Sequence, residues 1–118
     1  MILNGAIRWE RKCYDRFLFL SGDIIKIAGF AKKYFVITSK NAFIRATNVF
    51  HVCPLLQDIS AGPVHISVKG TDGTIGVAIC EQLKVIDPSV RACSRVDRLP
   101  YADIMEVSDT IHGIFEYD

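Results

Sequence analysis

The most informative stretch of the chain is residues 76–87, which read Gly-Val-Ala-Ile-Cys-Glu-Gln-Leu-Lys-Val-Ile-Asp. A short apolar run, typical of a β-strand, leads directly into an acid and an amide, and a base follows one leucine later. Burying such polar groups costs free energy unless hydrogen bonds satisfy them. The stretch therefore predicts an apolar strand that ends in a polar cluster capable of chemistry.

Further strand-like segments precede this stretch. They are rich in β-branched and aromatic residues and cover residues 17–20, 24–28, 34–38, 49–56 and 65–68. Residues 21–23 and 70–73 are turn signals, the second typical of a hairpin. Pro54 interrupts one segment and places that interruption at a sheet edge or a bulge. Residues 75–80 are expected to form one strand, and residues 83–86 to continue it after a kink.

The end of the chain changes its apolar period from two residues to three or four. Ile104, Val107, Ile111 and Ile114 follow this spacing, and Pro100 suits a first helical turn, so we expect a helix over about 100–115. Residues 40–48 are interpreted as a turn or one helical turn, and residues 90–96 as a short crossing segment. Residues 1–16 fit neither period and predict a short helix or a surface extension.

Five or six short strands and one terminal helix predict a mainly β fold, a small barrel with a helix packed across it. The length of 118 residues suits a single domain, residues 1–118. Within it we expect an N-terminal extension (1–18), a β-barrel (19–97) and a C-terminal helix with its tail (98–118).

Composition limits the classes of function. The net charge of +1 means that only a local basic patch would attract a nucleic acid. None of the four cysteines forms a C-x-x-C pair, and no His or Cys has metal-ligand spacing, so no metal or cofactor is expected. Cys53 and Cys80 lie in apolar segments, which favours buried, reduced thiols. No signal peptide and no membrane span are expected, and the predicted location is the cytoplasm.

Four segments, in this order and spacing, resemble one family. They are Gly22-Asp23-Ile24, residues 33–43 (Lys-Tyr-Phe-Val-Ile-Thr-Ser-Lys-Asn-Ala-Phe), Val52-Cys53-Pro54, and residues 77–87 around Glu81-Gln82. The order resembles the MazF/PemK (Kid) toxins of type II toxin–antitoxin modules. Residues 98–100 with 104–107 resemble the C-terminal helix of that family. The resemblance spans about residues 20–115 and leaves residues 1–18 as an extension atypical of it.

The resemblance implies a fold, an activity and partners. It implies an SH3-like barrel, a fold shared with gyrase-poisoning CcdB toxins, and a homodimer. It also implies metal-independent endoribonuclease activity on single-stranded RNA and neutralisation by a cognate antitoxin that binds in the dimer groove.

Carried over by position, the resemblance is uneven. The acid and amide of the family survive as Glu81 and Gln82, whereas its Arg-Pro pair is replaced by Lys33-Tyr34. The hydroxyl expected after Pro54 is missing, and a supporting arginine of one branch is replaced by Ile79. An Arg-to-Lys change at such a site is not conservative, because lysine lacks the planar bidentate fork.

The candidate catalytic residues are therefore Glu81 as base and Lys33 as phosphate holder. The RNA-binding candidates are Gln82, Lys84, Gln57, Lys32 and Phe30, the last as a stacking platform. Glu81 is equally well interpreted as a surface acid paired with Lys84. His51 and His65, on separate strands, are more often structural than catalytic, although histidine acts near neutral pH.

Three functions remain open from the sequence. One is an RNase toxin with a rearranged site. The second is a catalytically degenerate relative that binds an antitoxin, a nucleic acid (RNA or DNA) or a protein target. The third treats the chain as a generic small-barrel binding module.

Overall fold

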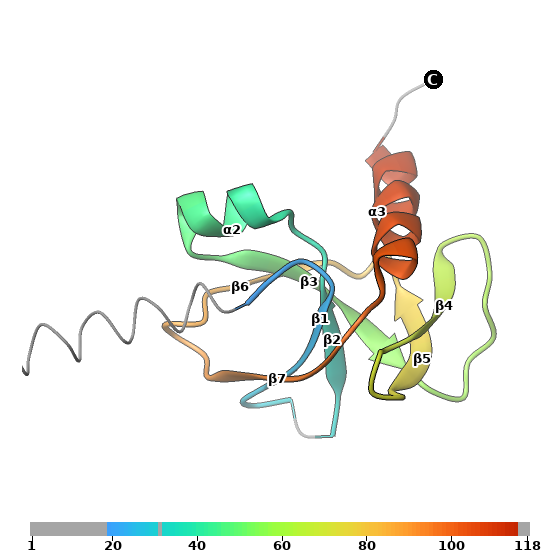
Figure 1. The fold of residues 1–118 in the computed structure, drawn as a ribbon, viewed down its shortest axis with the longest axis horizontal. Helices are drawn as coiled ribbons and strands as arrows, with labels where there is room; N and C mark the ends of the chain where they lie inside the picture. The colour runs from blue at the N-terminus through green and yellow to red at the C-terminus, as the bar shows by residue number, and fades with distance from the viewer. Residues whose placement is uncertain (1–18, 31, 116–118) are drawn as a thin grey trace, which may run out of the picture.

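The computed structural model describes residues 19–30 and 32–115, which fold into a curved antiparallel sheet with two helices (Figure 1). In chain order the elements are β1 (Asp23–Ile27), β2 (Tyr34–Ile37), α2 (Asn41–Thr47), β3 (Phe50–Leu56), β4 (His65–Lys69), β5 (Ile75–Ile79), β6 (Lys84–Ile86), β7 (Cys93–Arg98) and α3 (Tyr101–Phe115). The helix or extension predicted for residues 1–16 lies outside the described residues.

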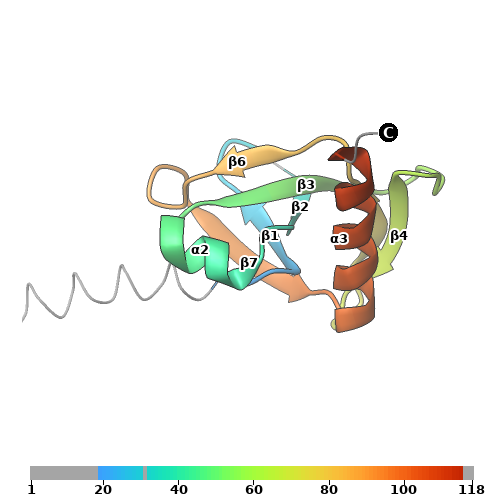
Figure 2. The same ribbon diagram turned by 90° about the horizontal axis from the view of Figure 1, so that it is seen from above.

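The sheet is organised around β3. Its strand order is β4-β5-β3-β2-β1-β7, and β6 also pairs with β3. The strands curl around an interior, with β4 and β7 at the two ends of the path (Figure 2). The predicted mainly β barrel with a C-terminal helix is therefore confirmed, in the form of a sheet that does not close completely.

The informative stretch, residues 76–87, supplies two strands to one side of β3. β5 pairs Ala78 with Leu55, and β6 pairs Lys84 with Val52, both antiparallel. Between these two pairings, the segment from Ala78 to Lys84 therefore contains three more residues than the facing segment of β3. The predicted strand with a kink is confirmed, and the kink is the turn that contains Glu81 and Gln82.

The core has two parts because the central strands bury both of their faces. Ile24 and Val36 belong to the cluster under α3, whereas their neighbours Ile25 and Phe35 belong to the cluster that includes Ile44 of α2. Consecutive residues point to opposite faces of a strand, so a continuous apolar run such as residues 24–25 is what a doubly covered strand requires. The two helices accordingly lie apart in both views (Figures 1 and 2).

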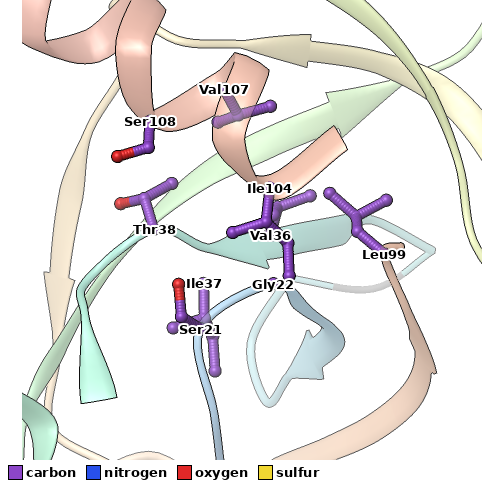
Figure 3. Close-up of a pocket in the computed structure, with 9 residues that line it drawn as sticks. All are labelled: Ser21, Gly22, Val36, Ile37, Thr38, Leu99, Ile104, Val107 and Ser108. Atoms are coloured by element: carbon purple, nitrogen blue, oxygen red, sulfur yellow. The ribbon is translucent and has the colours of Figure 1, made fainter. Parts of the chain in front are cut away.

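The helix α3 packs against the sheet where the chain has a glycine, Gly22. Gly22 has φ +85°, and a Cβ there would overlap the side chain of Ile104 (Figure 3). Val107, the fully buried residue of the helix, packs beside Val36. The space left beneath the helix is about 10 Å³, enough for one water molecule at most. This interface is a packed core and not a ligand site.

Several sequence expectations were wrong in detail. Residues 93–98, which overlap the crossing segment expected at 90–96, form the strand β7, which pairs with β1. Most residues of β7 are exposed, so its sequence lacks the apolar alternation of a strand. Phe19 and Leu20 form no strand, and Phe19 instead packs on Phe50 at 5.6 Å between ring centroids. Residues 41–47 form a seven-residue helix and not a single turn.

Pro54 is buried within β3, and pairs with Phe35 of β2. On the opposite side of β3 the partner changes from β6 to β5 between Val52 and Leu55. The proline, which has no N–H to donate, therefore lies at the interruption of that ladder, in accord with the expected irregularity. The predicted helix over 100–115 and the hairpin turn at residues 70–73 are confirmed.

Candidate functional site

The turn after β5 presents the polar cluster of the informative stretch to solvent. The amide of Gln82 donates to the Ile79 carbonyl at 3.1 Å, which closes the turn, and both Glu81 and Gln82 are exposed. On the side of β3 away from β2, neither β5 nor β6 pairs with the residues between Val52 and Leu55. The turn can therefore leave the sheet there without breaking a ladder. Exposure removes the desolvation cost that these groups would have in the core.

Glu81 forms a hydrogen bond with His65. The Nε2 atom of His65 lies 3.1 Å from Oε2 of Glu81, with the two side chains 29% and 43% exposed. The hydrogen bond from His65 lowers the pKa of the Glu81 carboxyl, and a backbone N–H contributes in the same direction. The partner of the acid is thus a histidine of β4 and not Lys84, the partner considered from the sequence.

The pairing follows from the β4–β5 hairpin. Its register sets His65 opposite Ile79, two residues before Glu81. A hairpin turn at residues 70–73 was expected from the sequence. Pairing the residues on either side of that turn would have predicted that His65 and Glu81 lie close together. From the sequence, His51 and His65 were considered separately, so the contact of His65 with Glu81 was not predicted.

Lys33 lies at a different part of the same surface. It precedes β2, whose first residue, Tyr34, pairs with Leu55. Lys33 is therefore level with Leu56 and Val77, whereas Glu81 lies in the turn beyond Ile79, the last residue of β5. The structure does not bring the two candidate catalytic residues together.

A cluster of cations and aromatic rings lies around the β1–β2 connection. Nζ of Lys84 and the guanidinium of Arg91 lie 5.5 and 5.0 Å from the centroid of the Phe30 ring. Nζ of Lys26 lies 5.5 Å from the ring of Tyr34. We call these residues, together with Lys32, the basic aromatic patch: Lys26, Phe30, Lys32, Tyr34, Lys84 and Arg91. Its two rings pack against opposite core clusters, and Lys26, which lies over Tyr34 and lines the hollow beside Phe30, joins them. A surface hollow of about 470 Å³ adjoins it, lined in part by Lys26, Phe30 and Lys32.

The patch has the composition of a single-strand nucleic-acid surface. Aromatic rings stack bases and cations hold the phosphates between them. Three of the predicted RNA-binding residues, Phe30, Lys32 and Lys84, belong to it. Lys26 and Arg91 were not predicted. Arg91 comes from the β6–β7 connection, where it also donates to the Ala28 carbonyl at 3.2 Å, and sequence distance hid this contact.

Gln57 lies apart from this patch, at the end of β3. Its Nε2 donates to the Ile75 carbonyl at 3.4 Å, and the residue lines a second hollow of about 470 Å³. Ile59 and Ile75, 41% and 58% exposed, form part of the same hollow. Gln57 therefore lies at the end of β3 that pairs with the start of β2, which Lys33 precedes.

Residues 19–30 and 32–115 contain neither a metal-binding cluster nor a membrane-spanning helix. In that part of the chain no three His, Cys, Asp or Glu residues come together in a way that would hold a metal ion. Neither described helix has the length and apolar character needed to cross a membrane.

A protein-family comparison decides the family. The model of the PemK-like, MazF-like toxin of type II toxin-antitoxin systems matches residues 27–115, which is most of the chain. The chain belongs to the PemK/MazF toxin family. Comparison with curated protein sequences gives no match.

Solved structures of MazF proteins share the fold. The MazE–MazF complex of Deinococcus radiodurans matches with a TM-score of 0.70 and 16% identity, over 81% of this chain and 94% of that chain. MazF alone from the same organism gives 0.68 and 14%, with the same coverage. An endoribonuclease in complex with its cognate antitoxin from a mycobacterial species gives 0.70 and 14%, over 85% of this chain and 99% of that chain.

The departures from the PemK/MazF pattern now have locations. Lys33-Tyr34, in place of Arg-Pro, lies beside Leu55 and Leu56, where the family hydroxyl is missing. Ile79, in place of the supporting arginine of one branch, is 2% exposed and part of the core. Glu81, the residue expected to correspond to the acid of the family, is in contact with His65 of β4.

Proposed function

We propose that this protein is the toxin of a type II toxin–antitoxin module and a metal-independent endoribonuclease that cuts single-stranded RNA. The observation that carries the proposal is the exposed Glu81–His65 pair, with 3.1 Å between Oε2 and Nε2, on a member of the PemK/MazF family. A carboxylate and an imidazole in contact are the two groups that acid–base cleavage of RNA requires.

In this mechanism Glu81 takes the proton of the 2′-hydroxyl and the 2′-oxygen attacks the adjacent phosphorus. The protonated imidazole of His65 gives its proton to the departing 5′-oxygen. The products are a 2′,3′-cyclic phosphate and a 5′-hydroxyl, so the protons balance without a metal. The lowered pKa of Glu81 keeps it ionised as a base at neutral pH.

The remaining residues bind the strand. The basic aromatic patch stacks bases and holds phosphates, and Gln82, beside the base, contacts the nucleotide at the cut. Lys33 and Gln57 contact a neighbouring part of the RNA strand, because both lie where the end of β3 pairs with the start of β2, away from the turn that carries Glu81. We thus propose a binding role for Lys33 in place of direct charge stabilisation at the scissile phosphate.

The proposed partners are a second copy of the chain and a cognate antitoxin. The solved MazE–MazF complex and the mycobacterial endoribonuclease with its antitoxin support the second partner. The helix α3 leaves Tyr101, Met105 and Phe115 exposed by 74%, 45% and 71%, which supports a homodimer through apolar surface.

The test is an RNA cleavage assay with purified protein free of antitoxin, in the presence of EDTA. Wild type is expected to cut single-stranded RNA and leave cyclic phosphate ends. Glu81→Gln and His65→Gln should each lose about a hundredfold or more in rate. The matched control is Asp109→Asn, an exposed acid of α3, which should cut at the wild-type rate.

A second function is favoured by the missing hydroxyl and the separation of Lys33 from Glu81. It is a catalytically degenerate family member that binds a nucleic acid or a protein target. If wild type binds single-stranded RNA but leaves diverse sequences intact, this function replaces the first. Cutting that survives Glu81→Gln would remove the proposed base.

A further inference from the structure

Two cysteines face each other across the strands that hold the candidate site. Leu55 of β3 pairs with Ala78 of β5, and this register, continued two residues past the ladder, sets Cys53 at the level of Cys80, the residue that follows β5. A step of two keeps side chains on one face of a sheet. All four residues accordingly belong to the core cluster beneath α3.

The two thiols are neighbours in this buried cluster. The Cys80 thiol donates a hydrogen bond to the Ala78 carbonyl at 3.7 Å. Both side chains are 0% exposed and both thiols are free. Cys93, the third cysteine of the described residues, packs in the other core cluster.

Directly opposed residues of an antiparallel pair have Cα atoms about 4.5 to 5.5 Å apart. Disulfides span Cα separations of about 4.4 to 6.8 Å. The adjoining Leu55–Ala78 pair therefore brings Cys53 and Cys80 close to the separation that a disulfide spans.

The two thiols differ in chemical character. The interaction with Cys80, and then burial, raises the pKa of Cys53, whereas the interaction with Cys53 lowers the pKa of Cys80. Cys80 is also the last residue before the exposed turn, where β5 leaves β3 and the chain gains three residues. Local opening of such a turn costs less than global unfolding and gives a small oxidant access to its sulfur.

We propose that Cys53 and Cys80 form a redox pair which a hydroperoxide, such as hydrogen peroxide, converts to a disulfide within one protein molecule. The Cys80 thiolate attacks the peroxide oxygen, the O–O bond breaks, and Cys80 becomes a sulfenic acid as hydroxide leaves. The Cys53 thiol then attacks the Cys80 sulfur, and the sulfenic oxygen leaves as water with the thiol proton.

The disulfide ties the middle of β3 to the residue that precedes Glu81. The cross-link lies on the side of β3 away from β2, where neither β5 nor β6 pairs with Cys53. It therefore restrains the turn that carries Glu81 and Gln82. The proposal concerns the thiols alone and holds whether or not the protein cuts RNA.

The experiment oxidises the reduced, full-length wild-type chain with hydrogen peroxide. Remaining thiols are then alkylated and the protein is digested without a reductant for mass mapping. We expect a linked peptide pair containing Cys53 and Cys80, 2 Da lighter than the two reduced peptides together, which dithiothreitol separates. The oxidised monomer should melt higher by on the order of 10 °C, because the cross-link restricts the unfolded chain.

Variants exclude the other cysteines. A chain with Cys13→Ser and Cys93→Ser should keep the link, and Cys53→Ala should stop Cys80 at sulfenic or sulfinic acid. The mapping itself uses wild type, so it does not depend on how a variant folds. Failure to find the link in folded protein, or a link that forms only in urea, would overturn the proposal. A product linked through Cys13 or Cys93 instead would overturn it as well.

Discussion

At the scale of single residues, Asp97 shows how a buried charge is kept stable in this fold. Its Oδ1 accepts from the Asp72 and Arg98 amides at 2.9 and 2.7 Å, and its Oδ2 accepts from the Thr74 amide at 3.0 Å. Burial acts to raise the pKa of Asp97, but the hydrogen bonds from these residues outweigh it and lower the pKa far below the usual range. Gly70 is required beside it, since a Cβ there would overlap the carboxylate.

The lowered pKa gives a stability prediction with a definite sign. The folded pKa lies below the unfolded value of about 4, so the stabilisation is present above pH 4 and is lost as pH falls toward the folded pKa. Asp97→Asn should lower the free energy of unfolding by about 2–3 kcal/mol at pH 7. In urea titrations its deficit relative to wild type should shrink from pH 4 to pH 2.

The control for Asp97 is Asp109→Asn, which removes the same charge from an exposed position of α3. It should stay within about 0.5 kcal/mol of wild type at each pH. A deficit of Asp97→Asn that is the same at pH 7 and pH 2.5 would show that ionisation of the carboxylate is not what stabilises the hairpin.

At the scale of elements, the junction of β1 with α3 depends on one glycine. The Gly22 amide donates to the Ile37 carbonyl at 2.8 Å, and its carbonyl accepts from the Leu99 amide at 2.9 Å. The residue thus links β1, β2 and the start of α3 in a backbone conformation with φ +85°. A side chain here would meet both an unfavourable φ and the side chain of Ile104.

Gly22→Ala is therefore expected to destabilise the protein by about 3 kcal/mol, with α3 lifted from the sheet. The matched variant is Gly73→Ala, because Gly73 has φ +98° but open space around its Cβ position. It should cost about 1 kcal/mol, the backbone strain alone. Thermal unfolding of both variants measures the difference. Equal losses would mean that the contact with Ile104 is absorbed without cost.

Elements were predictable from the sequence where local patterns act alone. The spacing of Ile104, Val107 and Ile111 identified α3, and the residues around Glu81 identified β5 and its kink. β7 was missed because a strand at the end of the sheet exposes most of its residues, including Val96. The pairings of Glu81 with His65 and of Cys53 with Cys80 depend on register between strands, which no single segment encodes.

At the scale of the whole molecule, the distribution of charge matters more than its sum. The net charge is only +1, yet three cations of the basic aromatic patch lie over its two aromatic rings, and a fourth, Lys32, lines the adjoining hollow. They come from β1, the β1–β2 connection, β6 and the β6–β7 connection, so only the folded chain brings them together. The helix α2, with its own exposed cations Lys40 and Arg45, lies away from the β1–β2 connection (Figure 1).

Binding of single-stranded RNA should therefore depend on salt through this patch. The probe is a 2′-O-methyl oligonucleotide, which lacks the attacking hydroxyl and so separates binding from cutting. Each phosphate contact to a single strand contributes about 0.7 to the slope of log affinity against log salt. Arg91→Gln and Lys84→Gln should each weaken binding and reduce the slope by about that amount, whereas Arg45→Gln on α2 should leave the slope unchanged.

Phe30→Leu separates stacking from charge within the same patch. It keeps an apolar side chain against Phe35, whose ring lies 5.4 Å from that of Phe30, but it removes the face on which a base stacks. Affinity should fall by roughly five- to a hundredfold, and the salt slope should stay constant because no phosphate contact is lost. Equal loss of slope for Arg45→Gln and Arg91→Gln would instead mean that RNA follows the overall positive charge. The patch would then be a feature of packing, with Lys84 and Arg91 covering an aromatic ring.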